Sequence, residues 1–143
     1  MTKTAIAPAT AGTGEPVKLP TDAIEILVAV LEHRGWDKRD GQFKMVEAIA
    51  DAFKTDDFSA IDVAINAPVG TGKTLGYIIA SIARGGRVVV ATSTKSLQEQ
   101  IIAEELPKLR EDLMAIYGYH LTYGVLKGQS NYACLDKIRA ALG

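Results

Sequence analysis

The sequence predicts an α/β fold in which helices flank a parallel β-sheet. Runs of β-branched and apolar residues at 61–67, 87–92 and 121–127 are typical of strands. Segments in which apolar residues recur every three or four positions lie between these runs and indicate amphipathic helices. Strands that alternate with helices in this way form βαβ units, whose strands lie parallel in one sheet.

The N-terminal part of the chain divides into a predicted tail and two predicted helices. Residues 1–20 are rich in Ala, Thr, Gly and Pro, so we expect a flexible tail there and a folded domain over residues 21–143. The first helix should bury one face, formed by Ile24, Leu27, Val28 and Leu31. The second begins near Asp40 and carries an apolar stripe from Met45 to Phe53.

The later elements follow from the same patterns. A helix is expected over residues 73–83, before the strand at 87–92, whose near-continuous β-branched run is typical of burial on both faces. A helix capped at Ser93 or Thr94 should run to about residue 106, where Pro107 ends or kinks it. A further helix at 108–117, the strand at 121–127 and a last helix ending at Leu142 complete the chain.

The composition limits the classes of function. The 143 residues fit one domain, and a hydrophobic content of 48% is enough for a core. The 16 Lys and Arg nearly balance the 17 Asp and Glu, whereas a dedicated nucleic-acid-binding domain usually has a basic surface. Any binding of DNA must therefore be local or shared with another surface.

The chain shows no sign of secretion or of membrane insertion. Cys134 is the one cysteine, so no intrachain disulfide can form. The first 20 residues contain no apolar signal segment, and the longest apolar stretch, at 26–31, is far too short to span a bilayer. We expect a cytoplasmic protein without a membrane partner.

A glycine-rich segment joins the first predicted strand to the helix at 73–83. The segment reads Ala67, Pro68, Val69, Gly70, Thr71, Gly72, Lys73, Thr74, which fits the phosphate-binding loop except that Ala67 replaces the first glycine. Glycines at 70 and 72 permit positive φ, so backbone N–H groups can turn toward an anion at the helix N-terminus. Lys73 would lie between the β- and γ-phosphates, and Thr74 would offer its hydroxyl to Mg²⁺. The alternative is a glycine-rich turn that happens to precede a helix.

With this loop identified, the chain resembles the DinG/XPD branch of superfamily 2 DNA helicases, especially bacterial and phage DinG-like proteins. The resemblance covers about two-thirds of the chain. It is carried, in the family's order, by an R-x-x-Q element at 39–45, motif I at 67–74, motif Ia at 89–100 and a segment before an iron–sulfur cysteine at 126–134. Pro68, Val69 and Gln129 depart from the residues usual in that family.

The resemblance implies a partial RecA-like P-loop NTPase domain, truncated before the Walker B carboxylate, from an ATP-dependent DNA helicase. Lys73 and Thr74 would then serve ATP hydrolysis. No acidic residue ends a predicted strand after the loop, so we expect the chain alone to be catalytically incomplete. A companion chain could carry the remaining motifs. The alternatives are a non-catalytic nucleotide-binding remnant or interaction module, or a different P-loop NTPase such as a small kinase.

The resemblance also assigns roles outside the loop. Gln42, with Arg39 nearby, would recognise adenine, although Gln42 could instead satisfy backbone N–H groups in the first turn of its helix. Trp36 could stack on the base, but such a residue is more often simply half-buried. Thr92, Ser93 and Thr94 would contact the phosphates of single-stranded or forked DNA weakly, although helix capping needs only one of them.

Cys134 occupies the position of a possible [4Fe–4S] ligand in the resemblance. A cluster of this kind needs four cysteines, so the others would have to come from outside this sequence. Cys134 also lies on a helical stripe with Leu135, Ile138 and Leu142, which favours a buried apolar thiol instead.

Overall fold

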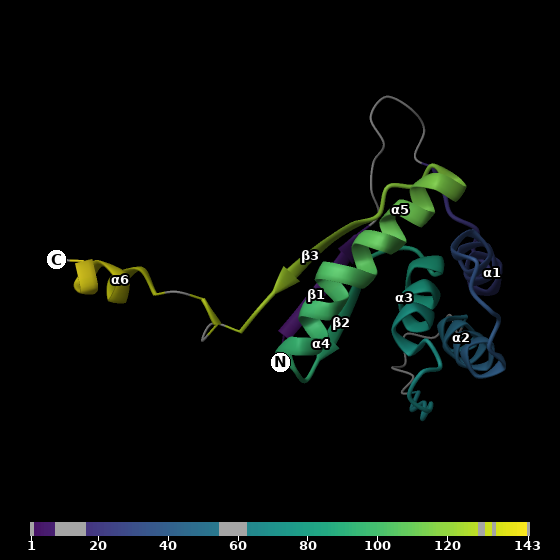
Figure 1. Ribbon diagram of the computed structural model, residues 1–143, viewed down its shortest axis with the longest axis horizontal. Coiled ribbons are helices and arrows are strands. Elements are labelled where there is room, and N and C mark those ends of the chain that lie inside the picture. The colour runs from purple at the N-terminus through teal and green to yellow at the C-terminus, as the bar shows by residue number, and fades with distance from the viewer. Residues whose placement is uncertain (1, 8–16, 55–62, 129–130, 133, 143) are drawn as a thin grey trace.

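The computed structural model describes residues 2–7, 17–54, 63–128, 131–132 and 134–142 of the chain. In chain order the elements are β1 (Thr2–Ala7), α1 (Ala23–Arg34), α2 (Asp40–Phe53), α3 (Lys73–Ala83), β2 (Val88–Thr92), α4 (Lys95–Gln100), the π-helical turn η1 (Ile101–Glu105), α5 (Leu106–Tyr117), β3 (Thr122–Leu126) and α6 (Leu135–Leu142). Figure 1 shows α1, α2 and α3 gathered on one side, α4 and α5 running along the sheet, and α6 standing apart at the end of the chain. None of the helices in these ranges is both long enough and apolar enough to cross a bilayer.

The three strands form one sheet in the order β2-β1-β3. Both pairings are antiparallel: Thr4 of β1 lies opposite Val90 of β2 and Val125 of β3. Because β2 and β3 are each antiparallel to β1, they run parallel to one another, as strands joined by a helical crossover do. The parallel pairing that the sequence predicts is therefore not found within the described residues, since β1 separates the two parallel strands.

The prediction of a flexible tail over residues 1–20 is wrong at Thr2–Ala7, which form the central strand of the sheet. The prediction rests on the average composition of residues 1–20. Within them, Thr2, Thr4 and Ile6 are β-branched, and such residues favour strands. Residues 1 and 8–16 lie outside the described part of the chain, and residues 17–20 have no regular secondary structure.

The strand predicted at 61–67 is also wrong over its described part. Residues 63–67 have no regular secondary structure, and residues 61–62 lie outside the described residues. Val63 and Ile65 are 46% and 39% exposed, so the alternating pattern is not buried in the sheet. A β-branched run forms a strand only where a neighbouring strand offers hydrogen bonds. In this structure β1, and not the segment at 63–67, takes the place beside β2.

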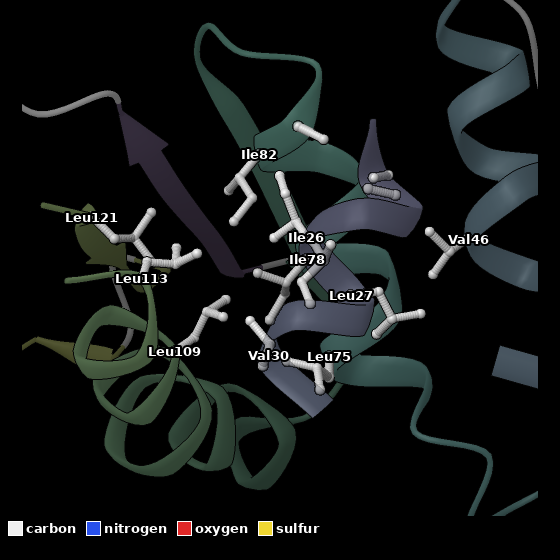
Figure 2. Close-up of a cluster of buried hydrophobic side chains, with 14 of the residues drawn as sticks. Ile26, Leu27, Val30, Val46, Leu75, Ile78, Ile82, Leu109, Leu113 and Leu121 are labelled. Atoms are coloured by element: carbon white, nitrogen blue, oxygen red, sulfur yellow. The ribbon is translucent and has the colours of Figure 1, made fainter. Parts of the chain in front are cut away.

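The hydrophobic core lies between α1, α3 and α5 (Figure 2). Ile26 of α1, Ile78 of α3 and Leu113 of α5 are each no more than 1% exposed. The residues from 78 to 83 in α3 are all buried, so this helix is central rather than peripheral. The start and the buried stripe of α3 match the sequence prediction.

The buried face of α1 is only partly as predicted. Leu27 and Leu31 are buried, whereas Ile24 and Val28 are half-buried. Ile26 and Val30 occupy the centre of the contact instead. The buried face of α1 differs from the predicted one because α1 contacts both α3 and α5. It therefore buries a wider stripe than a single partner helix would require.

The strand predicted to be buried on both faces is covered on one face only. Val88, Val90 and Thr92 are buried or half-buried, whereas Val89 is 54% exposed. On β3, Leu126 lies in the same row as Ala91 and is 59% exposed, whereas Val125 lies in the row of Val90 and is 41% exposed. The face of β2 that carries Val89 and Ala91 is therefore its exposed face, and the end of β3 is exposed on both faces.

Residues 95–117 form one helical run with a wider turn in its middle. The N–H of Leu106 donates to the carbonyl of Ile101, which is the five-residue spacing of a π-turn. Pro107 lies in the first turn of α5, directly after this wider turn and without an N–H to donate, so the helical run is irregular at Pro107 but does not end there.

The centrality of α5 predicts unequal effects of two neighbouring substitutions. Leu113→Ala removes a fully buried side chain and should lower the free energy of unfolding by about 2–5 kcal/mol. Met114→Ala removes a side chain that is 44% exposed and should change it by less than about 1 kcal/mol. Urea denaturation followed by circular dichroism measures both, and equal destabilisation would contradict this packing.

Candidate nucleotide site

The loop between residue 68 and α3 has the backbone shape that the sequence predicts. Gly70 and Gly72 have φ of 86° and 79°, both in the left-handed region that side chains rarely adopt. Gly72 is the N-cap of α3 and supplies no side-chain hydrogen bond to the helix. The first N–H groups of α3 therefore remain available to an anion at the positive end of the helix dipole.

Lys73 folds back on the loop that precedes it. Its Nζ donates to the carbonyl oxygens of Ala67 at 2.9 Å and Pro68 at 2.8 Å. The hydroxyl of Thr71 donates to the same Pro68 oxygen at 2.9 Å. These bonds close the loop around the lysine head, while Val69 stands at its tip, 98% exposed.

Two residues at the start of α2 hold the carbonyl groups of the two glycines. Nε2 of Gln42 donates to the Gly72 oxygen at 3.0 Å, and Gln42 is only 3% exposed. Nη1 of Arg39 donates to the Gly70 oxygen. The structure thus brings Arg39 and Gln42 to the loop, in contact with its backbone carbonyls. The backbone N–H bonding that was weighed as an alternative for Gln42 is not the contact observed.

A cleft of about 580 Å³ opens beside this loop. Its walls come from the loop, the start of α2, the segment after α1, and the α4–η1 region. The lining residues are Leu31, Gly35, Trp36, Asp37, Arg39, Gln42, Val69, Gly70, Gly72, Lys73, Thr74, Leu75, Gln100 and Glu105. A cleft of this size, with polar groups converging at one end, suits a nucleotide.

Gln100 and Glu105 reach the cleft, and no sequence motif predicts this. Gln100 precedes η1 and Glu105 is its last residue, and the wider turn of η1 rotates later residues relative to a regular α-helix. A helical pattern with a regular period cannot reveal this rotation. Pro107 just downstream is the one local signal of an irregular helix at this point.

Thr74 lies in a small polar group within the half-buried surface of α3. Burial raises the pKa of the Tyr77 phenol above its ordinary value, a hydrogen bond with Thr74 lowers it, and the charge of Glu105 raises it. The Thr74 hydroxyl is therefore a neighbour of the Tyr77 phenol, and Glu105 is close enough to that phenol to influence its charge.

Thr92, Ser93 and Thr94 lie together where β2 ends and α4 begins. The Thr94 hydroxyl caps α4 by accepting from the Leu97 N–H at 3.3 Å. Thr92 is buried and its hydroxyl donates to the Thr94 carbonyl at 3.3 Å. Ser93 is exposed, and its hydroxyl makes no hydrogen bond within the described residues.

Cys134 is an exposed free thiol, so the expected buried apolar thiol is wrong. The described residues contain no group of three or more His, Cys, Asp or Glu side chains that could hold a metal ion. A lone thiol does not fit a four-cysteine cluster. Gln129, the departure noted near this segment, lies outside the described residues.

The sequence is similar to those of known helicases. The sequence pattern of the DEAD/DEAH box helicases matches residues 42–140. The chain is 38% identical over 112 residues to the 3'-5' exonuclease DinG of Bacillus subtilis, covering 76% of this chain and 11% of that protein. It is 36% identical over 118 residues to the ATP-dependent helicase DinG of Mycobacterium tuberculosis, covering 80% and 17%.

The chain is also 30% identical over 104 residues to the ATP-dependent DNA helicase YoaA of Escherichia coli, covering 73% of this chain and 15% of that protein. It spans less than a fifth of the length of these relatives. No solved structure matches the chain. Because the family pattern covers residues 42–140 of 143 and includes the glycine-rich loop, the chain belongs to the DEAD/DEAH box helicases and is homologous to the DinG and YoaA helicases.

Proposed function

We propose that this chain is the N-terminal ATP-binding segment of a DinG-type DNA helicase, which couples ATP hydrolysis to DNA unwinding when the motor is complete. The observation that carries the proposal is the loop itself. Two glycines with positive φ lead into the uncapped N-terminus of α3, and the Lys73 ammonium lies against the carbonyls of the same loop. Backbone N–H groups, the helix dipole and one fixed cation then act on the same anion.

Each residue of the loop has a distinct part in this proposal. Residues 67–72 shape the backbone that surrounds the phosphates, and Lys73 neutralises charge on the β- and γ-phosphates. The Thr74 hydroxyl would hold Mg²⁺, which supplies charge neutralisation between those phosphates when bound. A complete motor also needs an acidic residue to orient water, and the remaining helicase motifs would supply it, in the same protein or in a companion chain.

Arg39 and Gln42 are proposed as adenine-recognising residues that also brace the loop. The Gln42 amide has a second N–H and an acceptor oxygen in addition to the donor used on Gly72. An amide that both donates and accepts matches N7 and N6 of adenine. The same side chain would then contact both the adenine and the backbone of the phosphate loop.

The RecA-like parallel sheet is proposed for the complete domain. The exposed Val63 and Ile65 border an apolar hollow of about 520 Å³ beside Phe53 and Tyr77, so this side of the domain has apolar surface that further elements of the complete domain would cover. In addition, Nε2 and Oε1 of the buried Gln98 have no hydrogen-bond partner within the described residues. A further strand backbone near α4 would offer both a donor and an acceptor.

Thr92, Ser93 and Thr94 are proposed to bind a phosphate of single-stranded or forked DNA. Their hydroxyls and the first N–H groups of α4 lie at the carboxyl end of β2, where α/β proteins bind ligands. The near-neutral net charge implies weak binding by this chain alone.

We propose that the protein acts on DNA in the cytoplasm. An iron–sulfur cluster forms no part of the proposal, since Cys134 alone does not fit one.

Lys73→Ala should weaken the binding of both Mg-ATP and inorganic tripolyphosphate by at least about tenfold, because it removes the cation beside the phosphates. Lys54→Ala, at an exposed lysine outside the cleft, should leave both affinities unchanged. Isothermal titration calorimetry on the folded proteins measures the difference. Wild-type affinity in Lys73→Ala would refute the site.

Gln42→Ala should reduce the preference for ATP over GTP by about tenfold if its amide recognises adenine. Lys44→Ala, at an exposed position on the same helix, serves as the control. Competition calorimetry with the two nucleotides gives the ratio. An equal loss of affinity for ATP, GTP and tripolyphosphate would show that Gln42 only braces Gly72.

Ser93→Ala should weaken binding of a fluorescent single-stranded oligonucleotide by about threefold at low salt without changing stability, because its exposed hydroxyl caps no helix. Thr94→Ala should instead cost about 1 kcal/mol of stability, since it removes the N-cap of α4. Fluorescence anisotropy and thermal unfolding separate the two effects. Unchanged anisotropy in Ser93→Ala would remove it from the DNA contact.

A further inference from the structure

The charged side chains that line the nucleotide cleft balance one another. They are Asp37, Arg39, Lys73 and Glu105. Both cations also donate hydrogen bonds to backbone carbonyl groups of the glycine-rich loop. A nucleoside triphosphate brings several negative charges into a cleft whose lining has no net positive charge. A cation that accompanies the ligand must therefore neutralise part of that charge.

Glu105 reaches the cleft because of the wide turn η1. The N–H of Leu106 donates to the carbonyl of Ile101, so this hydrogen bond spans five residues. In a regular α-helix, two residues five positions apart point about 140° away from each other. In a π-turn they lie nearly one above the other, and Gln100 and Glu105 are such a pair, both lining the cleft. The irregular turn thus places a carboxylate at the nucleotide site, and π-turns are frequent at functional sites.

Glu105 and Thr74 are neighbours of the same phenol. The turn η1 contacts α3, the helix that begins with Lys73 and Thr74. Burial raises the pKa of the Tyr77 phenol, and the two other groups that act on this pKa are Thr74, through a hydrogen bond, and Glu105, through its charge. Because both Thr74 and Glu105 also line the cleft, a hydroxyl and a carboxylate face the same ligand space.

This pair of oxygen donors suits a magnesium ion. Mg²⁺ prefers oxygen ligands, and it usually binds through one or two carboxylates and the phosphates of a substrate while it keeps several waters. The Thr74 hydroxyl, the Glu105 carboxylate and the phosphate oxygens are donors of this kind. Without a cation, the Glu105 carboxylate would instead repel the phosphates. Glu105 therefore opposes binding of the free nucleotide and favours binding of its magnesium complex.

We propose that Glu105, together with Thr74, binds the Mg²⁺ that accompanies the triphosphate and makes the cleft selective for the metal-bound nucleotide. This inference rests on the proposed nucleotide site and adds one metal ligand to it. The role concerns binding alone, because the acidic residue that orients water is a separate requirement of the complete motor.

The first test compares ATP binding in excess Mg²⁺ with ATP binding in EDTA by isothermal titration calorimetry. Wild-type protein should bind ATP more tightly in Mg²⁺. Glu105→Gln removes the charge and keeps the side-chain shape, so it should weaken binding about threefold in Mg²⁺ and strengthen it about threefold in EDTA. The ratio of the two affinities should thus fall about tenfold. A wild-type ratio in Glu105→Gln would overturn the proposal.

Two further carboxylates serve as controls. Glu104→Gln makes the same change of charge at the preceding residue, which is exposed and does not line the cleft. Asp37→Asn changes the other acidic residue of the cleft lining. Both variants should keep the wild-type ratio. An equal fall in Glu104→Gln would reduce the effect to overall charge, and a fall in Asp37→Asn alone would assign the metal to Asp37, so either result rejects the role of Glu105.

The second test follows the metal directly. Mn²⁺ replaces Mg²⁺ as the probe, and electron paramagnetic resonance distinguishes free from bound Mn²⁺. With a saturating non-hydrolysable ATP analogue, Glu105→Gln should bind Mn²⁺ about tenfold more weakly than wild type, and Glu105→Asp, which keeps a carboxylate, should recover part of the loss. Unchanged Mn²⁺ affinity in Glu105→Gln contradicts the assignment.

Thermal unfolding establishes that each variant is folded, and Glu105→Ala is judged by the same two readings if Glu105→Gln does not fold. Failure of this inference and failure of the proposed function are distinguishable. If wild-type protein binds neither Mg-ATP nor tripolyphosphate, the proposed function itself fails and this inference falls with it. Wild-type binding of Mg-ATP without an effect of Glu105→Gln rejects this inference alone.

Discussion

The close approach of α2 to α3 at Gly76 is the constraint on which the nucleotide site depends. A Cβ at Gly76 would displace the terminal methyl of Met45 and come within 3.2 Å of Val46 Cγ2, so glycine at this position favours the close packing of the two helices. A glycine inside a helix costs about 1 kcal/mol relative to alanine, which the packing of α2 on α3 must offset. One turn earlier, the same approach brings the Gln42 amide to the Gly72 carbonyl. At Gly72 a Cβ would lie 2.5 Å from Gln42 Nε2, so this position of the Gln42 amide is compatible with glycine at residue 72, which the positive φ also favours.

The central helix therefore serves both the core and the chemistry. The residues of α3 from 78 to 83 are buried in the core, while its first turn carries Lys73 and Thr74 at the cleft. A helix buried this fully cannot tilt without opening the contacts with α1 and α2. Rigid packing at one end thus fixes the position of the groups at the other.

Sequence reasoning succeeds where the structure is determined locally. The glycine-rich loop and α3 match their prediction because positive φ at Gly70 and Gly72 and an apolar stripe are properties of neighbouring residues. It fails where segments far apart in the sequence could occupy the same place in the sheet. The sheet position beside β2 is taken by Thr2–Ala7, and no local pattern says which β-branched run will win it. It also fails at η1, since one added residue in a helical turn changes which side chains reach the cleft, and Glu105 is found only by following the chain through that turn.

In the proposed nucleotide site, the bonds of Lys73 would allow a chain with almost no net charge to bind a highly charged ligand. Its ammonium has three donors, and two are used on the carbonyls of Ala67 and Pro68. The third donor points to no described acceptor and can meet a phosphate without dismantling the loop. Because charge-assisted hydrogen bonds are roughly twice as strong as neutral ones, exchange of one carbonyl for a second phosphate oxygen would also be favourable. The loop is therefore ordered before its ligand arrives, so little conformational entropy is lost on binding. Affinity at this site then depends on a few preorganised groups rather than on the charge of the whole protein.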